Sequence, residues 1–384
     1  MSERRLSALL RSMPIPEEPQ AEERAWELVR AAHARAARTP SNKLFQGFGR
    51  RRVLVAVLAG AAVAAAALSP PGLAVLGSLR DALAPGHVSQ QRSQLGSLPT
   101  RGDVLVTGAN GAWIVHADGS KRRLGAYRDA AWSPHGLYVA AAQGRQLLAL
   151  DPQGNVHWTL VRAQPVRLPS WSPAAAPKDT RIAYLAGTVL HVVGGDGRGD
   201  RAIADAVAPA RPAWRPGARF VLAFASAHAV RVYSVEPLRL VWRARLPETP
   251  TGLAWSSDGS RLLALSPRGL RVFDASGKLV RRDDHPVVAA AFPPGAREPF
   301  EVRRHGAQTS VVSLANGRSV FTTTGEIGGL AFSPDGRWLL LGWRSADQWL
   351  FLRRGTKRVV GVANVARAFD SNAFPQLAGW CCGS

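Results

Sequence analysis

The chain has 384 residues, of which 46% are hydrophobic, enough for two or three domains or one large repeat array with a sizeable core. Its formal net charge is +22 at pH 7, so its surface attracts anions of any kind. No zinc-finger spacing, RNA-recognition signature or basic heptad helix accompanies this charge, which argues against nucleic-acid binding. The only two Cys are neighbours, which excludes a disulfide framework and a structural zinc site of about four N or S ligands.

Residues 1–48 are expected to form a cytoplasmic tail with one amphipathic helix. Small or apolar residues recur every three or four positions between 17 and 38. Acidic residues fill the first half of this stretch and Arg the second, an order that the helix dipole favours. Two interpretations stay open: a solvated helix beside a membrane, and a docking helix that binds a protein partner through Trp26, Leu28 and Val29.

Residues 49–77 have the composition of a transmembrane helix. Val53–Leu68 contains no polar side chain, and the run resumes after a short break, giving about 24 residues, enough to cross ~30 Å of hydrocarbon. The cluster Arg50–Arg52 precedes it, so the positive-inside rule places the tail in the cytoplasm and the rest of the chain outside. A cleaved export signal with a cleavage site at Ala65–Ala67 and a buried core helix remain as alternatives.

A polar linker, residues 78–102, leads into a repeat. Each copy has a short apolar strand that ends on an aromatic residue, a turn whose fullest form is Ser-Pro-Asp-Gly, and further β-rich runs separated by polar turns. The spacing of the aligned aromatics, roughly 40 residues, is that of a four-stranded propeller blade. These aromatics, interpreted as core between blades, are Trp132, Trp171, Trp214, Trp255, Phe292 and Phe332.

The two ends of the repeat region complement each other. Residues 376–384, QLAGWCCGS, align with the first strand of a repeat and place Trp380 beneath Phe332. Residues 103–125 hold the second, third and fourth strands of a unit that lacks a first strand. Because an open ring leaves unpaired strand edges, we expect the ends to share one blade. The prediction for 103–384 is all-β: a seven-bladed β-propeller closed by N- and C-terminal strands, preceded by a cytoplasmic helix and one transmembrane helix.

The repeat resembles the WD-repeat superfamily, and more closely its bacterial members whose turn reads Ser-Pro-Asp-Gly. That motif is complete at Ser333–Gly336 and departs by one residue at Ser256–Gly259. The Trp-Asp dipeptide and the buried Asp–His network of eukaryotic members are absent, so the resemblance implies a propeller and not their scaffolding roles. The order of acidic helix, Arg cluster, span and exported domain is similar to that of bacterial transmembrane anti-sigma factors. Their zinc-type cytoplasmic module needs a His and a Cys pair, and this tail has His33 and no Cys.

The sequence predicts a binding site rather than a catalytic one. The inner strands consist almost wholly of Ala, Gly, Leu, Ser and Pro, without a carboxylate pair for acid–base chemistry or a metal-ligand cluster. No catalytic, cofactor-binding or metal-ligating residue is therefore assigned. Arg128, Arg167 and Arg211 open three successive inner strands and are the candidate ligand-binding residues, since charge-assisted hydrogen bonds hold anions. The alternative is solvated Arg at loop edges.

Three further motifs have structural interpretations. Residues 194–200, GGDGRGD, are expected to form a hairpin turn, since no helix follows as a nucleotide-binding loop requires. Residues 283–285, Asp-Asp-His, are interpreted as a loop charge cluster rather than a metal site. Cys381 and Cys382 follow the last inner strand, where they can form a vicinal disulfide, pair between chains or remain free.

These features favour a single-pass protein of the cell membrane, with a cytoplasmic N-terminus and an extracytoplasmic propeller. Its expected function is non-catalytic recognition of a protein partner, with a role in envelope sensing or signalling to a cytoplasmic partner. Two other classes stay open. One is a propeller hydrolase or lyase with a channel site, and the other is a structural envelope protein that binds an anionic polymer through its charge.

Overall fold

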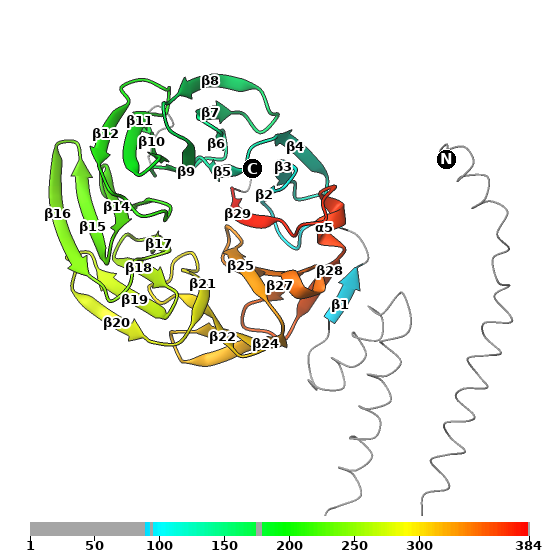
Figure 1. Cartoon of the computed structure of the whole chain (residues 1–384). Helices are drawn as coiled ribbons and strands as arrows, with labels where there is room; N and C mark the ends of the chain where they lie inside the picture. The colour runs from blue at the N-terminus through cyan, green and yellow to red at the C-terminus, as the bar shows by residue number, and fades with distance from the viewer. Residues whose placement is uncertain (1–88, 93–94, 174–178, 383–384) are drawn as a thin grey trace, which may run out of the picture. The chain divides into compact units, whose positions relative to one another are not determined.

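The computed structural model describes residues 89–92, 95–173 and 179–382. Within them the chain forms a closed ring of seven β-sheets (Figure 1), which confirms the predicted propeller. No helix of the described residues is long and apolar enough to cross a membrane. The predicted tail helix, the predicted span at 49–77 and the candidate partner-binding residues Trp26, Leu28 and Val29 lie outside the described residues.

Each sheet is one blade, and its first strand lies nearest the centre of the ring (Figure 1). Blade 1 comprises β29 (Gln376–Cys381), β2 (Asp103–Gly108), β3 (Gly111–Val115) and β4 (Lys121–Gly125); blade 2 comprises β5 (Asp129–Trp132), β6 (Val139–Gln143), β7 (Gln146–Leu150) and β8 (Val156–Val161); blade 3 comprises β9 (Val166–Trp171), β10 (Arg181–Ala186), β11 (Val189–Gly194) and β12 (Arg201–Ala204). Blade 4 comprises β13 (Ala213–Trp214), β14 (Val221–Ser226), β15 (Ala229–Val235) and β16 (Leu238–Arg245); blade 5 comprises β17 (Gly252–Trp255), β18 (Arg261–Ser266), β19 (Gly269–Asp274) and β20 (Leu279–Asp283). Blade 6 comprises β21 (Val287–Ala291), β22 (Phe300–His305), β23 (Gln308–Ser313) and β24 (Arg318–Thr324); blade 7 comprises β25 (Ile327–Phe332), β26 (Trp338–Trp343), β27 (Gln348–Arg353) and β28 (Val359–Ala363). The short helices η2 (Arg344–Ala346) and α5 (Val365–Ala368) follow β26 and β28.

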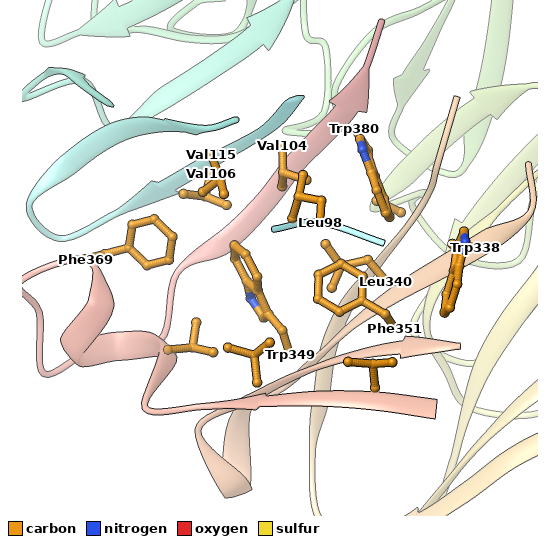
Figure 2. Close-up of a cluster of buried hydrophobic side chains, with 14 residues drawn as sticks. Leu98, Val104, Val106, Val115, Trp338, Leu340, Trp349, Phe351, Phe369 and Trp380 are labelled. Atoms are coloured by element: carbon orange, nitrogen blue, oxygen red, sulfur yellow. The ribbon is translucent and has the colours of Figure 1, made fainter. Parts of the chain in front are cut away.

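Blade 1 is built from both ends of the described chain. Strand β29 pairs antiparallel with β2 and sets Val104 opposite Trp380. The Trp380 side chain is 8% exposed and meets the ring of Phe351 edge-on at 5.7 Å between centroids. Figure 2 shows it within an apolar cluster that also holds Trp349 and Leu98. The predicted closure by N- and C-terminal strands is therefore confirmed.

Burial accounts for the aromatic residue at the end of most inner strands, and in blades 4 and 5 a hydrogen bond adds to it. The indole N–H of Trp214 donates to the carbonyl oxygen of Ser170 at 3.0 Å, and that of Trp255 donates to Ala213 at 3.1 Å. Each acceptor immediately precedes the aromatic of the preceding blade. These two indoles thus join neighbouring inner strands. Most of the repeat aromatics are buried in the core, as the sequence predicted, and Trp132 and Phe292 are partly buried.

The Ser of the repeated turn is needed for its hydroxyl group. Ser333 Oγ accepts a hydrogen bond from the amide of Trp338 at 2.9 Å and donates to Asp335 Oδ1 at 2.5 Å. Gly336 completes the turn with a φ of +66°, which favours glycine. The same bonds recur around Ser256 in blade 5, and both serines are 0% exposed.

The outer strands differ in a way that the repeat did not predict. In blades 1 to 6 the register between the third and fourth strands shifts by one residue, as at a β-bulge. In blade 7 the pairing of β27 with β28 is regular, and β28 accepts a fifth strand, β1 (Ser89–Arg92), in parallel. Bulges hinder further pairing at a sheet edge. The regular edge of blade 7 is therefore the one suited to receive the chain that leads into the ring.

Ring closure can be tested by truncating its buried Trp. We expect Trp380→Ala to lower the free energy of unfolding by about 3–5 kcal/mol, because it leaves a cavity in the shared blade. Gln376→Ala, an exposed position on the same strand, is the matched control and should change stability little. Denaturant unfolding of both variants measures the difference. Equal small losses would show that closure does not depend on the Trp.

Candidate functional site

The three predicted ligand-binding arginines lie where successive inner strands begin. Arg128 precedes β5 and is exposed, and Arg167 on β9 is also exposed. The Arg167 guanidinium donates to the carbonyl oxygen of Gly187 at 3.1 Å. Arg211 precedes β13 and is half-buried. The structure therefore places all three at corresponding strand ends but gives each a different environment.

Arg211 is engaged by the protein itself. Its Nη2 lies 2.5 Å from Oδ1 of Asp129, and its Nη1 donates to the carbonyl oxygen of Pro169. The second carboxylate oxygen of Asp129 accepts the amide N–H of Leu168 at 2.6 Å. A carboxylate of blade 2, the backbone of blade 3 and a guanidinium of blade 4 are thus joined. Because Asp129 offsets its charge, Arg211 acts first as a cross-link between blades. Arg128, just before β5, and Arg167, on β9, are exposed cations.

Sequence reasoning missed Asp129. It is the only acidic residue in the seven inner strands as the structure bounds them, and it directly follows Arg128. That isolation was the available signal, since a carboxylate at the end of an apolar inner strand needs a partner. Its partner stands 82 positions away, too far along the chain for any local pattern to identify.

A second polar cluster lies between blades 5 and 6. The carboxylate of Asp283 contacts Arg303 Nη2 at 2.6 Å and His285 Nδ1 at 2.6 Å. Arg303 also pairs with Glu301, which is 0% exposed. Burial raises the pKa of Glu301; Arg303 opposes this rise and the nearby negative charge of Asp283 adds to it. One partly exposed guanidinium therefore pairs with two carboxylates, of which Glu301 is fully buried.

The next residue, Asp284, also forms ion pairs with arginines. Asp284 contacts Arg271 Nη2 at 2.6 Å and Arg282 Nε at 2.6 Å. Across residues 89–92, 95–173 and 179–382, no group of three or more His, Cys, Asp or Glu side chains is arranged to hold a metal ion. Residues 283–285 are engaged in ion pairs with Arg271, Arg282 and Arg303 and with one another.

The other two motifs have clear positions. Residues 194–200 join β11 to β12, which pair antiparallel, so the expected hairpin turn is confirmed. Cys381 and Cys382 form a vicinal disulfide at the end of β29. Cys381 Sγ lies 3.7 Å from the carbonyl oxygen of Ser133, and Cys382 Sγ lies 3.6 Å from that of Pro134. The disulfide therefore rests on the first turn of blade 2, beside the ring closure.

The comparisons with known proteins identify the fold. No protein-family description and no curated protein matches the chain. A chain of the mitotic checkpoint complex shares 19% identity at a TM-score of 0.50, over 61% of this chain and 78% of that one. A chain of Kuenenia stuttgartiensis hydrazine synthase shares 15% identity at a TM-score of 0.48, over 59% and 76%. In all, 1374 chains of solved structures match, and the similarity supports the propeller fold and no particular role.

The buried carboxylate predicts a pH effect. The pKa of Glu301 in the folded protein exceeds its ordinary 4.5, so its contribution to stability is full below that value and is lost as the pH rises through the raised pKa. Glu301→Gln cannot ionise. We therefore expect the melting temperature of this variant minus that of the wild type to increase as the pH is raised from about 4 to about 7.

The matched control is Glu326→Gln, because Glu326 forms an exposed pair with Arg304 at 2.8 Å. Its melting-temperature difference from the wild type should vary less with pH, since solvent screens an exposed ion pair. A difference for Glu301→Gln that stayed constant across the same pH series would show that this carboxyl group does not titrate abnormally.

Proposed function

We propose that the protein is a membrane-anchored, non-catalytic binding module whose propeller lies outside the cytoplasm and recognises a protein partner. The seven-bladed, WD-repeat-like fold is consistent with an interaction module. The main supporting observation is that the acidic group at the inner strands is already bound by other groups of the protein. Asp129, the one acidic residue there, is engaged by Arg211 and Leu168, so the described inner strands offer no free pair of acid and base groups for catalysis.

Anchoring is supported by the sequence and by where the chain joins the ring. The apolar stretch 49–77 follows the cluster Arg50–Arg52, the order expected of a span with a cytoplasmic N-terminus. Further along the chain, β1 pairs with the outer edge of blade 7. In this proposal the chain emerges from the membrane, reaches the propeller at blade 7 and ties it to the bilayer. The propeller displays its loops as rigid binding surfaces.

Two surfaces carry recognition in this proposal. On the propeller, the exposed Arg128 and Arg167 bind an anionic group of the ligand beside the Asp129–Arg211 pair. In the tail, Trp26, Leu28 and Val29 are the apolar anchors for a cytoplasmic partner. The span connects the two, and binding outside is sensed by the partner inside.

Membrane topology can be tested on the full chain. We expect it to remain in the membrane after alkaline extraction, and protease added to intact spheroplasts should degrade the propeller and spare the tail. Leu58→Arg combined with Val63→Arg should release the protein, because each charge at the centre of a span costs about 3 kcal/mol. A shortened protein in the soluble fraction would instead identify a cleaved export signal.

Partner binding can be tested by cross-linking the full chain in its native membrane. Trp26→Ala combined with Leu28→Ala should abolish capture of a cytoplasmic partner, and Arg128→Gln combined with Arg167→Gln should weaken capture of an external one. The controls are Gln20→Ala, a polar position in the tail sequence, and Arg268→Gln, an exposed position on the propeller. Capture on both sides that is unchanged in the test variants would refute these binding assignments.

A further inference from the structure

Six cationic residues gather on one face of the ring at blade 7. We define the basic face of blade 7 as Arg101, Arg337, Arg353, Arg354, Lys357 and Arg358. Two backbone hydrogen bonds hold the group together, from Arg354 N–H to the oxygen of Arg337 at 2.9 Å and from Arg353 N–H to that of Arg358 at 3.0 Å. Thr100 joins them through its hydroxyl group, which donates to Asp335 Oδ2 at 3.0 Å.

The charge of this face is not balanced. All six residues are exposed, and none of them takes part in the ion pairs found among the described residues. Asp335 is the one acidic residue in turns 333–337 and 353–358, and it accepts hydrogen bonds from Ser333 and Thr100. Elsewhere in the ring some exposed arginines, such as Arg297 and Arg304, have carboxylate partners, and the exposed arginines of β16 are not among the ion pairs of the described residues.

Two of the guanidinium groups are held in place before any ligand arrives. Arg354 lies over the rings of Phe300 and Phe332, 5.6 and 5.7 Å from their centroids, and donates to the carbonyl oxygen of Gly336 at 2.8 Å. Arg358 lies 5.8 Å from the centroid of Trp338. A cation fixed by ring and carbonyl contacts loses less conformational entropy when it binds an anion.

The basic face adjoins a partly apolar hollow of about 240 Å³. Its walls include Leu98, Pro99, Trp338, Phe351 and Val360, and Arg358 is the cation among them. Figure 2 shows Leu98, Trp338 and Phe351 in this region. A soluble polyanion would contact only the guanidinium. An amphiphile can place its charged group against the guanidinium and its apolar part against the apolar walls.

We propose that the basic face of blade 7 docks on the anionic phospholipid headgroups of a bilayer, with Arg358 holding a headgroup phosphate at the hollow. That this bilayer is the membrane that holds the anchor rests on the proposed function. Strand β1 pairs with β28 of the same blade, so the tether and the basic face belong to one part of the ring. Docking therefore orients the propeller on the membrane and leaves the loops of the other blades to bind partners.

The test uses residues 80–384, which form a compact unit that contains the whole closed ring and lack the predicted span. We expect this fragment to sediment with vesicles of phosphatidylcholine and phosphatidylglycerol and not with phosphatidylcholine alone. Arg353→Gln, Lys357→Gln and Arg358→Gln together should weaken binding roughly a hundredfold, at the usual contribution of a basic residue near an anionic bilayer. Arg337→Gln alone should weaken it roughly fivefold, which provides a reading if the triple variant fails to fold.

The matched control removes the same charge elsewhere. Arg239→Gln, Arg243→Gln and Arg245→Gln change three exposed residues of β16, and this variant should bind close to the wild type. Equal loss in both triple variants would overturn the proposal, because net charge alone would then explain binding. Failure of the wild type to bind anionic vesicles, or its displacement by inorganic phosphate or soluble polyphosphate at matched ionic strength, would also overturn it.

These outcomes are separate from the test of the anchor. The fragment lacks residues 1–79, so its binding reports on the basic face whether or not residues 49–77 span a membrane. A protein that proves to be anchored but whose fragment ignores anionic vesicles retains the proposed function and loses this inference. A fragment that binds through the basic face while the full chain proves not to be anchored keeps the lipid site and loses the proposed anchor.

Discussion

The whole ring depends on the pairing of β29 with β2, which joins the last described strand to the first strand of the ring that follows the tether. Without that pairing, two sheet edges and the cluster around Trp380 lose their partners. Each blade is also packed on the next by the aromatics that end the inner strands. Closure therefore leaves neither inner edge of the shared blade unpaired and holds the first and last blades of the described chain together.

Control of strand edges explains where the rest of the chain is attached. Six outer strands carry register shifts that discourage further pairing, and β28 in blade 7 does not. The tether strand β1 occupies that regular edge. The register of the outer strand thus explains both observations. A bulged outer strand hinders pairing with a further strand, and the regular outer strand of blade 7 allows it. The unbalanced basic face lies in this same blade.

The arginines that give the chain its large positive charge fall into two groups. Some arginines are structural: Arg211 joins three blades through Asp129, and Arg303 serves both Asp283 and Glu301. Their charge is offset inside the scaffold and contributes little to long-range attraction. Other arginines, among them those of the basic face of blade 7, take part in no ion pair among the described residues. Only charge of the second kind is available to an external anion.

The amino-acid sequence by itself determined the blade number, the closure and the position of the repeat aromatics. Each of these rests on a pattern that recurs along the chain, and the incomplete units at 103–125 and 376–384 complete each other by simple count. Only the tertiary structure decided that Arg211 is held by Asp129, that Glu301 is buried beside Asp283, and that blade 7 alone has a regular outer edge among the described blades. Those features depend on contacts between residues far apart in the chain, which no local period encodes.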